Sequence, residues 1–307
     1  MRKAFINALM KIAEKDKRIF LLTGDLGFSF LEDFKKRFPG RFFDVGVAEQ
    51  NMIGIAAGLA LTGKIVFAYS IVPFITMRCF EQIRNDLCFQ DLNVKLIGIG
   101  GGVAYGTAGP THHATEDVAV MRSLVNMTVI TPGDPVESEM AFNYAMEHNG
   151  PVYIRLGKGN EPAVHSSKNI DISKGLVIDN GKDLTIIVSG SLLNAAKQVS
   201  LLLKKCGISV RLISMPMIKP LDDKAILESA SKTKAIFTIE EHGIIGGLAE
   251  AVCSVLARSR KKVLFKAFAL PDEYSKLVGS QAHILEKRGL SAGKITKEIL
   301  KIWRKNK

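Results

Sequence analysis

Short apolar runs alternate with segments of helical periodicity along almost the whole chain. The pattern predicts strands joined by helices, and therefore mostly parallel sheets with helices on both faces. The predicted strands are 19–22, 42–45, 65–69, 94–99, 127–131, 152–155, 184–188, 208–213, 235–239 and 263–268. The predicted helices are 5–13, 49–61, 74–87, 135–147, 192–204, 224–231, 247–256 and 294–303.

A polar stretch divides this alternation into two parts. Residues 157–170 are rich in Gly, Pro, Ser and Asn, a composition typical of a linker. A length of 307 residues also suits two domains of ordinary size. We therefore expect two consecutive α/β domains, one covering residues 1–165 and the other residues 166–307.

The composition excludes several classes of protein. Hydrophobic residues make up 47% and charged residues 23%, as in soluble globular proteins. The four cysteines are scattered without a C-x-x-C pair, which argues against a disulfide framework or zinc ribbon and fits a cytoplasmic protein. The most apolar region, 53–77, is interrupted by Gly58, Gly63, Lys64 and Pro73, so we expect no membrane contact.

The positive charge is concentrated at the C-terminal end. From Arg258 onward there are fourteen Lys or Arg and four acids, which accounts for +10 of the net +12. Aromatic residues are sparse there, so the stretch offers no stacking platform and we expect no nucleic-acid partner. A solvated helical face is the favoured interpretation, and complementarity to an acidic partner is the alternative.

Ligands of such sheets bind at the carboxyl ends of the strands. Four stretches with chemically useful residues follow predicted strands: 24–29, 45–51, 100–113 and 154–159. The third contains many glycines, which permit close approach of the backbone to a ligand. It matches no phosphate-binding fingerprint.

Individual residues in these stretches allow two interpretations each. Glu49 precedes an apolar helix, where an acid usually meets the helix dipole, but it could also share a proton with a ligand nitrogen. His112 and His113 are adjacent and point in different directions, which disfavours a metal site and leaves acid–base and capping roles about equal. Arg155 suits a phosphate or a surface ion pair, and Phe74 suits the core or a stacked ring.

Together these segments resemble the second half of transketolase. More closely, the chain is similar to the separate C-terminal subunit of split, thiamine-diphosphate-dependent transketolase-like enzymes. The resemblance covers nearly the whole chain. It rests on the motifs GDLG (24–27), GVAEQNM (46–52), EQIRND (81–86), GPTHHATED (109–117), TVITPGDP (128–135), PVYIRLGKG (151–159) and EEHGIIGGL (240–248).

The resemblance implies a pyrimidine-binding domain followed by a transketolase C-terminal domain. It implies that Glu49 hydrogen-bonds the ring nitrogen N1′ of the cofactor's aminopyrimidine, that Phe74 stacks on this ring and that His112 acts near the substrate. The remaining implied contacts are Asp25 and Tyr105 with the cofactor, and Arg155, Ser29, Arg2 and His113 with the substrate.

Two positions depart from the family pattern. Transketolase has an aspartate where this chain has Ala108 and a histidine where it has Gly100. Two polar contacts to the sugar are therefore missing or moved, and Tyr105 or His113 is the expected replacement. We therefore do not expect the usual pentose phosphates as substrates.

The family's diphosphate-binding half, which holds Mg²⁺, has no counterpart after GDLG. We expect no metal site in this chain, a companion subunit that supplies this half, and an assembly of two copies of each chain or a dimer of this chain. The chain alone is expected to show no ketol transfer.

The implied reaction is transfer of a two-carbon ketol unit from a phosphorylated ketose to an aldehyde. Two other enzymes of this cofactor remain as alternatives: the beta subunit of a 2-oxo-acid dehydrogenase, and a deoxyxylulose-phosphate-synthase-like enzyme. A non-catalytic scaffold with a basic tail is the alternative from another class.

Overall fold

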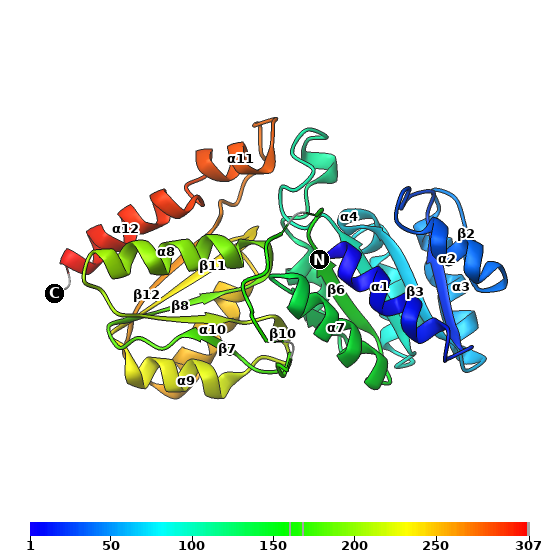
Figure 1. Ribbon diagram of the computed structural model, residues 1–307, viewed down its shortest axis with the longest axis horizontal. Coiled ribbons are helices and arrows are strands. Elements are labelled where there is room, and N and C mark those ends of the chain that lie inside the picture. The colour runs from blue at the N-terminus through cyan, green and yellow to red at the C-terminus, as the bar shows by residue number, and fades with distance from the viewer. Residues whose placement is uncertain (160, 168, 306–307) are drawn as a thin grey trace.

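Two sheets lie side by side along the long axis of the computed structural model, which describes residues 1–159, 161–167 and 169–305 (Figure 1). The strand order is β10-β5-β6-β4-β3-β1-β2 in the first sheet and β12-β11-β8-β9-β7 in the second. Within the described residues only the edge strands β10 and β7 pair antiparallel. The prediction of two α/β units with mostly parallel sheets is confirmed.

Every predicted strand is present, and β7 and β10 are additional. The first sheet contains β1 (Ile19–Thr23), β2 (Phe42–Asp44), β3 (Ile65–Ile71), β4 (Val94–Ile99), β5 (Thr128–Ile130), β6 (Val152–Leu156) and β10 (Met217–Lys219). The second contains β7 (Leu176–Asp179), β8 (Leu184–Val188), β9 (Val210–Ser214), β11 (Ala235–Gly243) and β12 (Leu264–Leu270).

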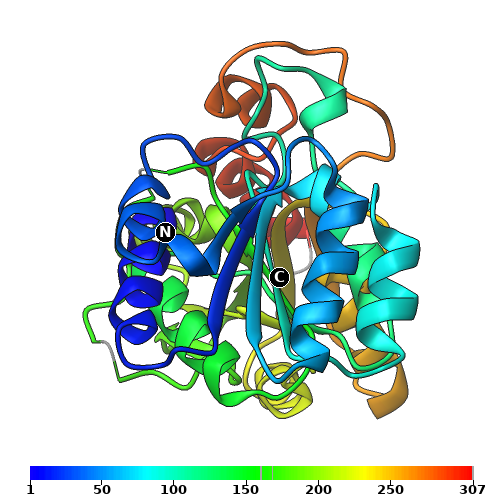
Figure 2. The same cartoon turned by 90° about the vertical axis from the view of Figure 1, so that its right-hand side faces the viewer.

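Helices cover both faces of the first sheet. In β3, Val66 and Ala68 share a core with helix α3, whereas Ile65 and Phe67 share the opposite core with helix α1. Figure 2 views this sheet edge-on between its two helical layers. The helices of the first half are α1 (Arg2–Ala13), α2 (Glu32–Arg37), α3 (Glu49–Leu61), α4 (Val72–Ile75), α5 (Phe80–Gln82), α6 (Asp117–Ser123) and α7 (Pro135–Glu147).

The single helix predicted at 74–87 is broken. After α4, the amides of Met77 and Arg78 both donate to the carbonyl of Pro73, so the regular ladder stops. The chain resumes as α5 and continues into a π-helical turn, Ile83–Cys88. Arg78 therefore lies at a corner between two helical pieces rather than within a helix.

The basic C-terminal end forms an amphipathic helix. The helices of the second half are α8 (Leu193–Lys205), α9 (Asp223–Lys232), α10 (Leu248–Ser259), α11 (Gln281–Lys287) and α12 (Ala292–Lys305). Helix α12 buries Ile295, Thr296 and Ile299, while Lys294 and Lys301 are exposed and pair with glutamates. This arrangement supports a solvated helical face. No helix in the described part of the chain is long and apolar enough to cross a membrane.

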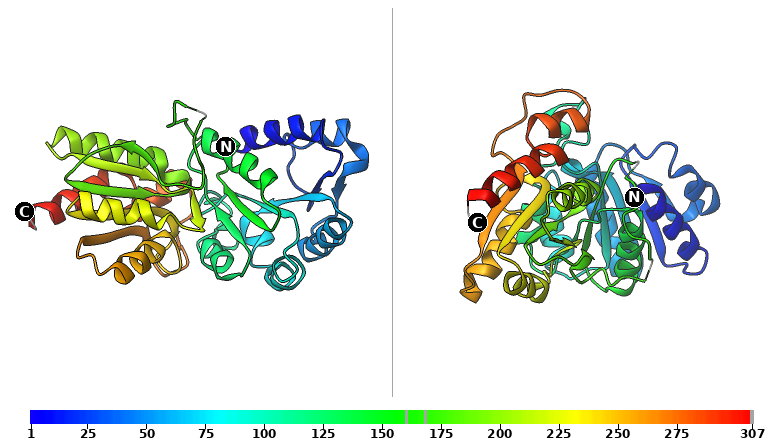
Figure 3. Two further views of the ribbon diagram at one scale, coloured as in Figure 1. Left: turned by 90° about the horizontal axis from the view of Figure 1, so that it is seen from below. Right: turned by 60° about the vertical axis from the view of Figure 1, so that its left-hand side comes forward.

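The two halves are interlocked. β10 comes from the second half but pairs with β5 of the first sheet. The segment between the halves is also fixed, because Asp134 Oδ2 accepts the backbone N–H groups of Val164 and His165 at 2.8 and 2.9 Å. Figure 3 shows the N-terminus close to the junction of the halves. The domain boundary near residue 165 stays a prediction.

Candidate active site

Glu49 is a buried carboxylate at the carboxyl end of the first sheet. It is the first residue of α3, immediately after the loop that follows β2, and only 1% of it is exposed. Its side chain turns inward: Oε1 accepts a hydrogen bond from Ser70 Oγ at 3.0 Å. Oε2 lies 2.5 Å from Arg78 Nη1. The helix dipole favours the charge of Glu49, but both carboxylate oxygens have side-chain partners.

Aromatic and basic side chains extend from Glu49 across the ends of the strands. The Arg78 guanidinium carbon lies 4.2 Å from the centre of the Phe74 ring. The edge of His112 approaches Phe74 with ring centres 5.2 Å apart, and Tyr105 lies 6.2 Å beyond His112. Lys158 Nζ is 4.6 Å from the centre of Tyr105. We call this set the active-site row: Glu49, Arg78, Phe74, His112, Tyr105 and Lys158.

The topology explains why residues so far apart in sequence meet. Strands β3, β4 and β6 are parallel neighbours, so their carboxyl ends share one edge. Phe74 follows β3, the loop with Tyr105 and His112 follows β4, and Lys158 follows β6. Four predicted site residues (Glu49, Phe74, Tyr105 and His112) therefore come together, as expected for the carboxyl edge of such a sheet.

A glycine creates the room for Tyr105. Gly100 has φ +79°, and a β-carbon there would lie 2.1 Å from Tyr105 Cε2. The tyrosine ring therefore fills the space of a side chain at position 100. Burial raises the pKa of Tyr105, and nearby Arg2 opposes that rise.

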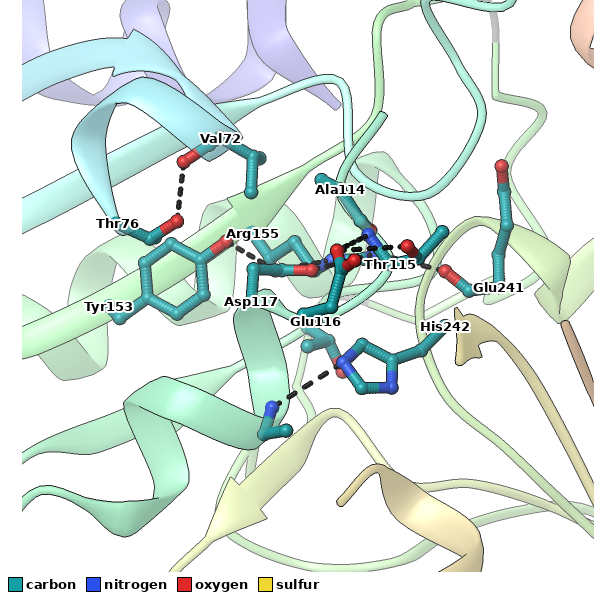
Figure 4. Close-up of polar contacts among 12 residues, drawn as sticks. Val72, Thr76, Ala114, Thr115, Glu116, Asp117, Tyr153, Arg155, Glu241 and His242 are labelled. Carbon is teal, nitrogen blue, oxygen red and sulfur yellow. Dashed lines mark hydrogen bonds and ion pairs between the residues drawn. The ribbon is translucent and has the colours of Figure 1, made fainter. Parts of the chain in front are cut away.

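The structure does not bring Arg155, the predicted phosphate ligand, to the active-site row. Its side chain is 5% exposed, and its Nε donates to Asp117 Oδ2 at 2.8 Å. Nη2 donates to the carbonyls of Ala114 and Glu241, both at 2.9 Å (Figure 4). Burial lowers the pKa of Arg155, but the charge of Asp117 raises it overall. Arg155 forms an internal ion pair with Asp117, and its hydrogen bond to the Glu241 carbonyl links the two halves of the chain.

The structure also does not bring His113, a predicted substrate contact, to the row. His113 is 5% exposed and lines a different cavity with Val103, Leu270 and Ile284. Burial lowers its pKa, and its Nε2 has no hydrogen-bond partner among the described residues. Adjacent histidines point to opposite sides here, so only His112 faces the row.

Three predicted residues lie around the site without joining the row. Asp25 is exposed with φ +52°, and its amide donates to Asp44 Oδ1 at 2.8 Å. Ser29 is exposed, and its amide donates to Glu32 Oε1 at 2.6 Å. Arg2 lies over the Phe30 ring at 3.3 Å. Their roles toward cofactor and substrate stay predictions.

The sequence analysis missed Arg78, Ser70 and Lys158. A cation four residues after Phe74 was the only signal for Arg78. Lys158 belongs to the same IRLGKG stretch as Arg155 and is the exposed cation of the two. Among the residues that the structure describes, no group of three or more His, Cys, Asp or Glu could hold a metal ion.

Two family models account for most of the chain. Residues 1–163 match "Transketolase, pyrimidine binding domain", and residues 173–295 match "Transketolase, C-terminal domain". The chain belongs to the transketolase family.

Relatives that align over nearly their whole length are named as transketolase subunits. The chain is 36% identical to an apulose-4-phosphate transketolase subunit of Phocaeicola vulgatus, over 99% of this chain and 97% of that protein. It is also 36% identical to a 6-deoxy-6-sulfo-D-fructose transketolase subunit of Clostridium sp. (strain MSTE9), over 97% of this chain and 92% of that protein. A solved structure, "Split gene transketolase, inactive beta4 tetramer", matches with a TM-score of 0.88 at 38% identity, over 98% of this chain and 96% of the chain in that structure. This chain is therefore a C-terminal subunit of a split transketolase-like enzyme.

Membership of the transketolase family implies dependence on thiamine diphosphate. The active-site row fits the aminopyrimidine of this cofactor. Glu49 offers a buried carboxylate and Phe74 offers an aromatic face. The planar N–C–N group of Arg78 already contacts both, which shows that the space accepts a flat nitrogen-rich group.

Proposed function

We propose that this chain holds the aminopyrimidine of thiamine diphosphate in an enzyme that transfers a two-carbon ketol unit from an anionic, phosphorylated ketose to an aldehyde. The observation that carries the proposal is the buried carboxylate of Glu49 beside the face of Phe74. When bound, thiamine diphosphate supplies the carbanion chemistry that breaks and re-forms a carbon–carbon bond next to a carbonyl.

The residues of the row have distinct roles in this proposal. Glu49 accepts a hydrogen bond from the ring nitrogen N1′ and holds the proton there, while Ser70 fixes the orientation of its carboxylate. Phe74 provides the surface for stacking. His112, held by Thr111 Oγ1 at 3.1 Å from its Nδ1, exchanges protons with substrate oxygens. The Tyr105 hydroxyl replaces a polar contact that transketolase takes from position 100.

Cations at the edge of the row support an anionic substrate. Lys158 is exposed beside Tyr105, and Arg2 is close enough to influence the pKa of Tyr105. We assign the anionic end of the ketose to Lys158, with Arg2 and Ser29, in place of Arg155. The names of both relatives, an apulose 4-phosphate and a sulfofructose transketolase subunit, support an anionic sugar. The altered positions 100 and 108 argue against the usual pentose phosphates.

A companion subunit completes the proposed enzyme. It holds the diphosphate and Mg²⁺, and two copies of each chain form the active assembly in the cytoplasm. The relatives that are named as subunits support this division. The absence of catalysis in the chain alone follows from it.

The test is a titration with the protein from the adjoining open reading frame, thiamine diphosphate and Mg²⁺, followed by calorimetry and by a ketol-transfer assay. We expect tight cofactor binding only in the mixture. Glu49→Gln keeps the shape but removes the ionisable carboxylate, so ketol transfer falls at least a hundredfold. The matched control is Glu298→Gln on the exposed face of α12, and this variant should keep full activity.

The substrates separate the alternative enzymes. Decarboxylation of a 2-oxo acid with acyl transfer to lipoamide identifies a dehydrogenase subunit, and consumption of pyruvate with an aldehyde identifies a deoxyxylulose-phosphate-synthase-like enzyme. No cofactor binding in any mixture contradicts the proposal and favours the scaffold.

A further inference from the structure

Arg78 makes the two contacts that the proposed function gives to the aminopyrimidine. Its Nη1 lies 2.5 Å from Glu49 Oε2, and its guanidinium carbon lies 4.2 Å from the centre of the Phe74 ring. A guanidinium is flat, positively charged and carries donors on an N–C–N frame. A protonated aminopyrimidine presents a similar flat N–C–N edge to a carboxylate.

These contacts take the positions that the proposed function gives to the pyrimidine ring. The other Glu49 oxygen already accepts from Ser70, so Arg78 holds the only carboxylate oxygen without another side-chain donor among the described hydrogen bonds. The rings of His112 and Phe74 form a T-shaped pair with centres 5.2 Å apart. A ring cannot stack on the face of Phe74 that Arg78 covers, or bond to Glu49 Oε2, while the guanidinium is there.

We propose that the Arg78 side chain occupies the pyrimidine site in the free chain and moves out of it when the cofactor binds. This inference rests on the proposed function. It assigns Arg78 as a competitor for the site rather than as a ligand of the cofactor.

The surroundings of Arg78 permit this movement. Its side chain is 39% exposed whereas that of Glu49 is 1% exposed, so the arginine leaves toward solvent without unpacking the core. It also lies at the corner between α4 and α5, outside a regular helix. While it stays, it neutralises a buried carboxylate that would otherwise be unpaired, and the empty site remains folded.

Competition reduces the affinity of the free chain for the cofactor. A ligand that binds only the conformation with Arg78 displaced has an apparent affinity reduced by the fraction of that conformation. The extra diphosphate contacts of the companion subunit then decide whether the cofactor displaces the arginine. Loading of the cofactor is thereby linked to assembly.

The test uses thiamine, which has the same aminopyrimidine but no diphosphate and therefore does not need the companion. Thiamine binding to the full chain is measured by calorimetry for the unmodified protein and for Arg78→Ala. We expect about tenfold tighter binding to Arg78→Ala, equivalent to about 1.4 kcal/mol. The control is Arg84→Ala, a nearby exposed arginine that bonds to Asn85 and does not contact Glu49, and its affinity should be unchanged.

Two additions keep the test decisive. Arg78→Gln provides a shorter, uncharged side chain with a donor for Glu49, and it replaces Arg78→Ala if that variant does not fold. The guanidinium Nη–H NMR signals of Arg78, assigned by their loss in the variant, report displacement directly, because Nη1 is the nitrogen bonded to Glu49. They should lose the signature of this hydrogen bond when thiamine saturates the chain.

The inference and the proposed function fail in different ways. Equal or weaker thiamine binding without Arg78, or no binding to either form, overturns the inference. An Arg78 Nη–H signal that keeps its hydrogen bond to Glu49 at saturation does the same. The proposed function is judged separately, by thiamine diphosphate binding and ketol transfer in the mixture with the companion.

Discussion

The ring of Tyr105 occupies the volume in which a side chain at position 100 would stand. A β-carbon on Gly100 would lie 2.1 Å from Tyr105 Cε2. The resemblance implies a transketolase histidine at this position, and we expect the ring of Tyr105 to take the place of that side chain. Tyr105 thereby reaches His112 on one side and Lys158 on the other.

Gly100→Ala should displace Tyr105 and destabilise the chain by about 1–3 kcal/mol, because φ +79° is unfavourable for alanine and its β-carbon meets the ring. Tyr105→Ala removes the clash but not the strained φ. The double variant should therefore lose less stability than the sum of the two single variants in urea unfolding. Strict additivity would show that the ring does not occupy this space in solution.

Lys158→Ala should raise the KM for a phosphorylated ketose about tenfold and leave the melting temperature unchanged, because Lys158 is exposed and contacts only the Tyr105 ring in the described structure. Steady-state kinetics of the assembled enzyme measure this. Lys174→Ala, another exposed lysine outside the row, is the control. An unchanged KM would remove Lys158 from the substrate site.

Arg155→Met should cost about 3–5 kcal/mol of folding free energy, because it leaves the buried carboxylate of Asp117 without its cation. Replacing both residues, as Arg155→Met with Asp117→Leu, should restore part of the loss. Chemical unfolding of the unmodified chain and the two variants is the measurement. A stable Arg155→Met chain with weak substrate binding would instead return Arg155 to the phosphate site.

Asp134 should make the chain sensitive to acid. Burial alone raises its pKa, but hydrogen bonds from His165, Glu137 and Val164 lower it to about 2, below the ordinary 3.8. Ionised Asp134 therefore contributes about 2 kcal/mol to the free energy of unfolding above pH 4. This contribution is lost as the pH falls from about 4 toward 2, because the carboxylate becomes protonated in the folded chain.

Asp134→Asn isolates this contribution. Its stability deficit relative to the unmodified chain should be largest at pH 5.5 and shrink as the pH falls to 2.5, while the effects of other carboxylates cancel between the two proteins. His165 is a second partner with a raised pKa, so measurements below pH 6 keep it charged. A deficit that does not change with pH would contradict the low pKa of Asp134.

The strands could be predicted because buried parallel strands read as short apolar runs between helical segments. β10 was missed because Met217–Lys219 is too short to form a pattern, and its partner β5 lies far back in the sequence. The helix at 74–87 was predicted whole because apolar spacing continues through it. The break depends on hydrogen bonds to the Pro73 carbonyl, which spacing does not reveal.

Part of the candidate site could also be predicted, because it depends on the order of strands and helices along the chain. Glu49, Phe74, Tyr105 and His112 follow strands whose carboxyl ends must meet, so topology alone brings them together. The inward direction of Arg155 was not predictable because an arginine near the end of a strand can point into the protein or out of it. Its direction depends on Asp117, which lies on a helix that the sequence analysis did not predict. Arg78 was missed because its meeting with Glu49 depends on the break after α4.

β10 has a consequence for the integrity of the molecule. A fragment that ended near residue 165 would lack this strand, and β5 would become an open sheet edge with unpaired backbone groups. Open edges of this kind recruit strands from other molecules and lead to aggregation. Together with the bonds from Arg155 and Val103 to Glu241, the strand ties the two halves together, so the first half depends on the second for the strand that covers the edge of β5.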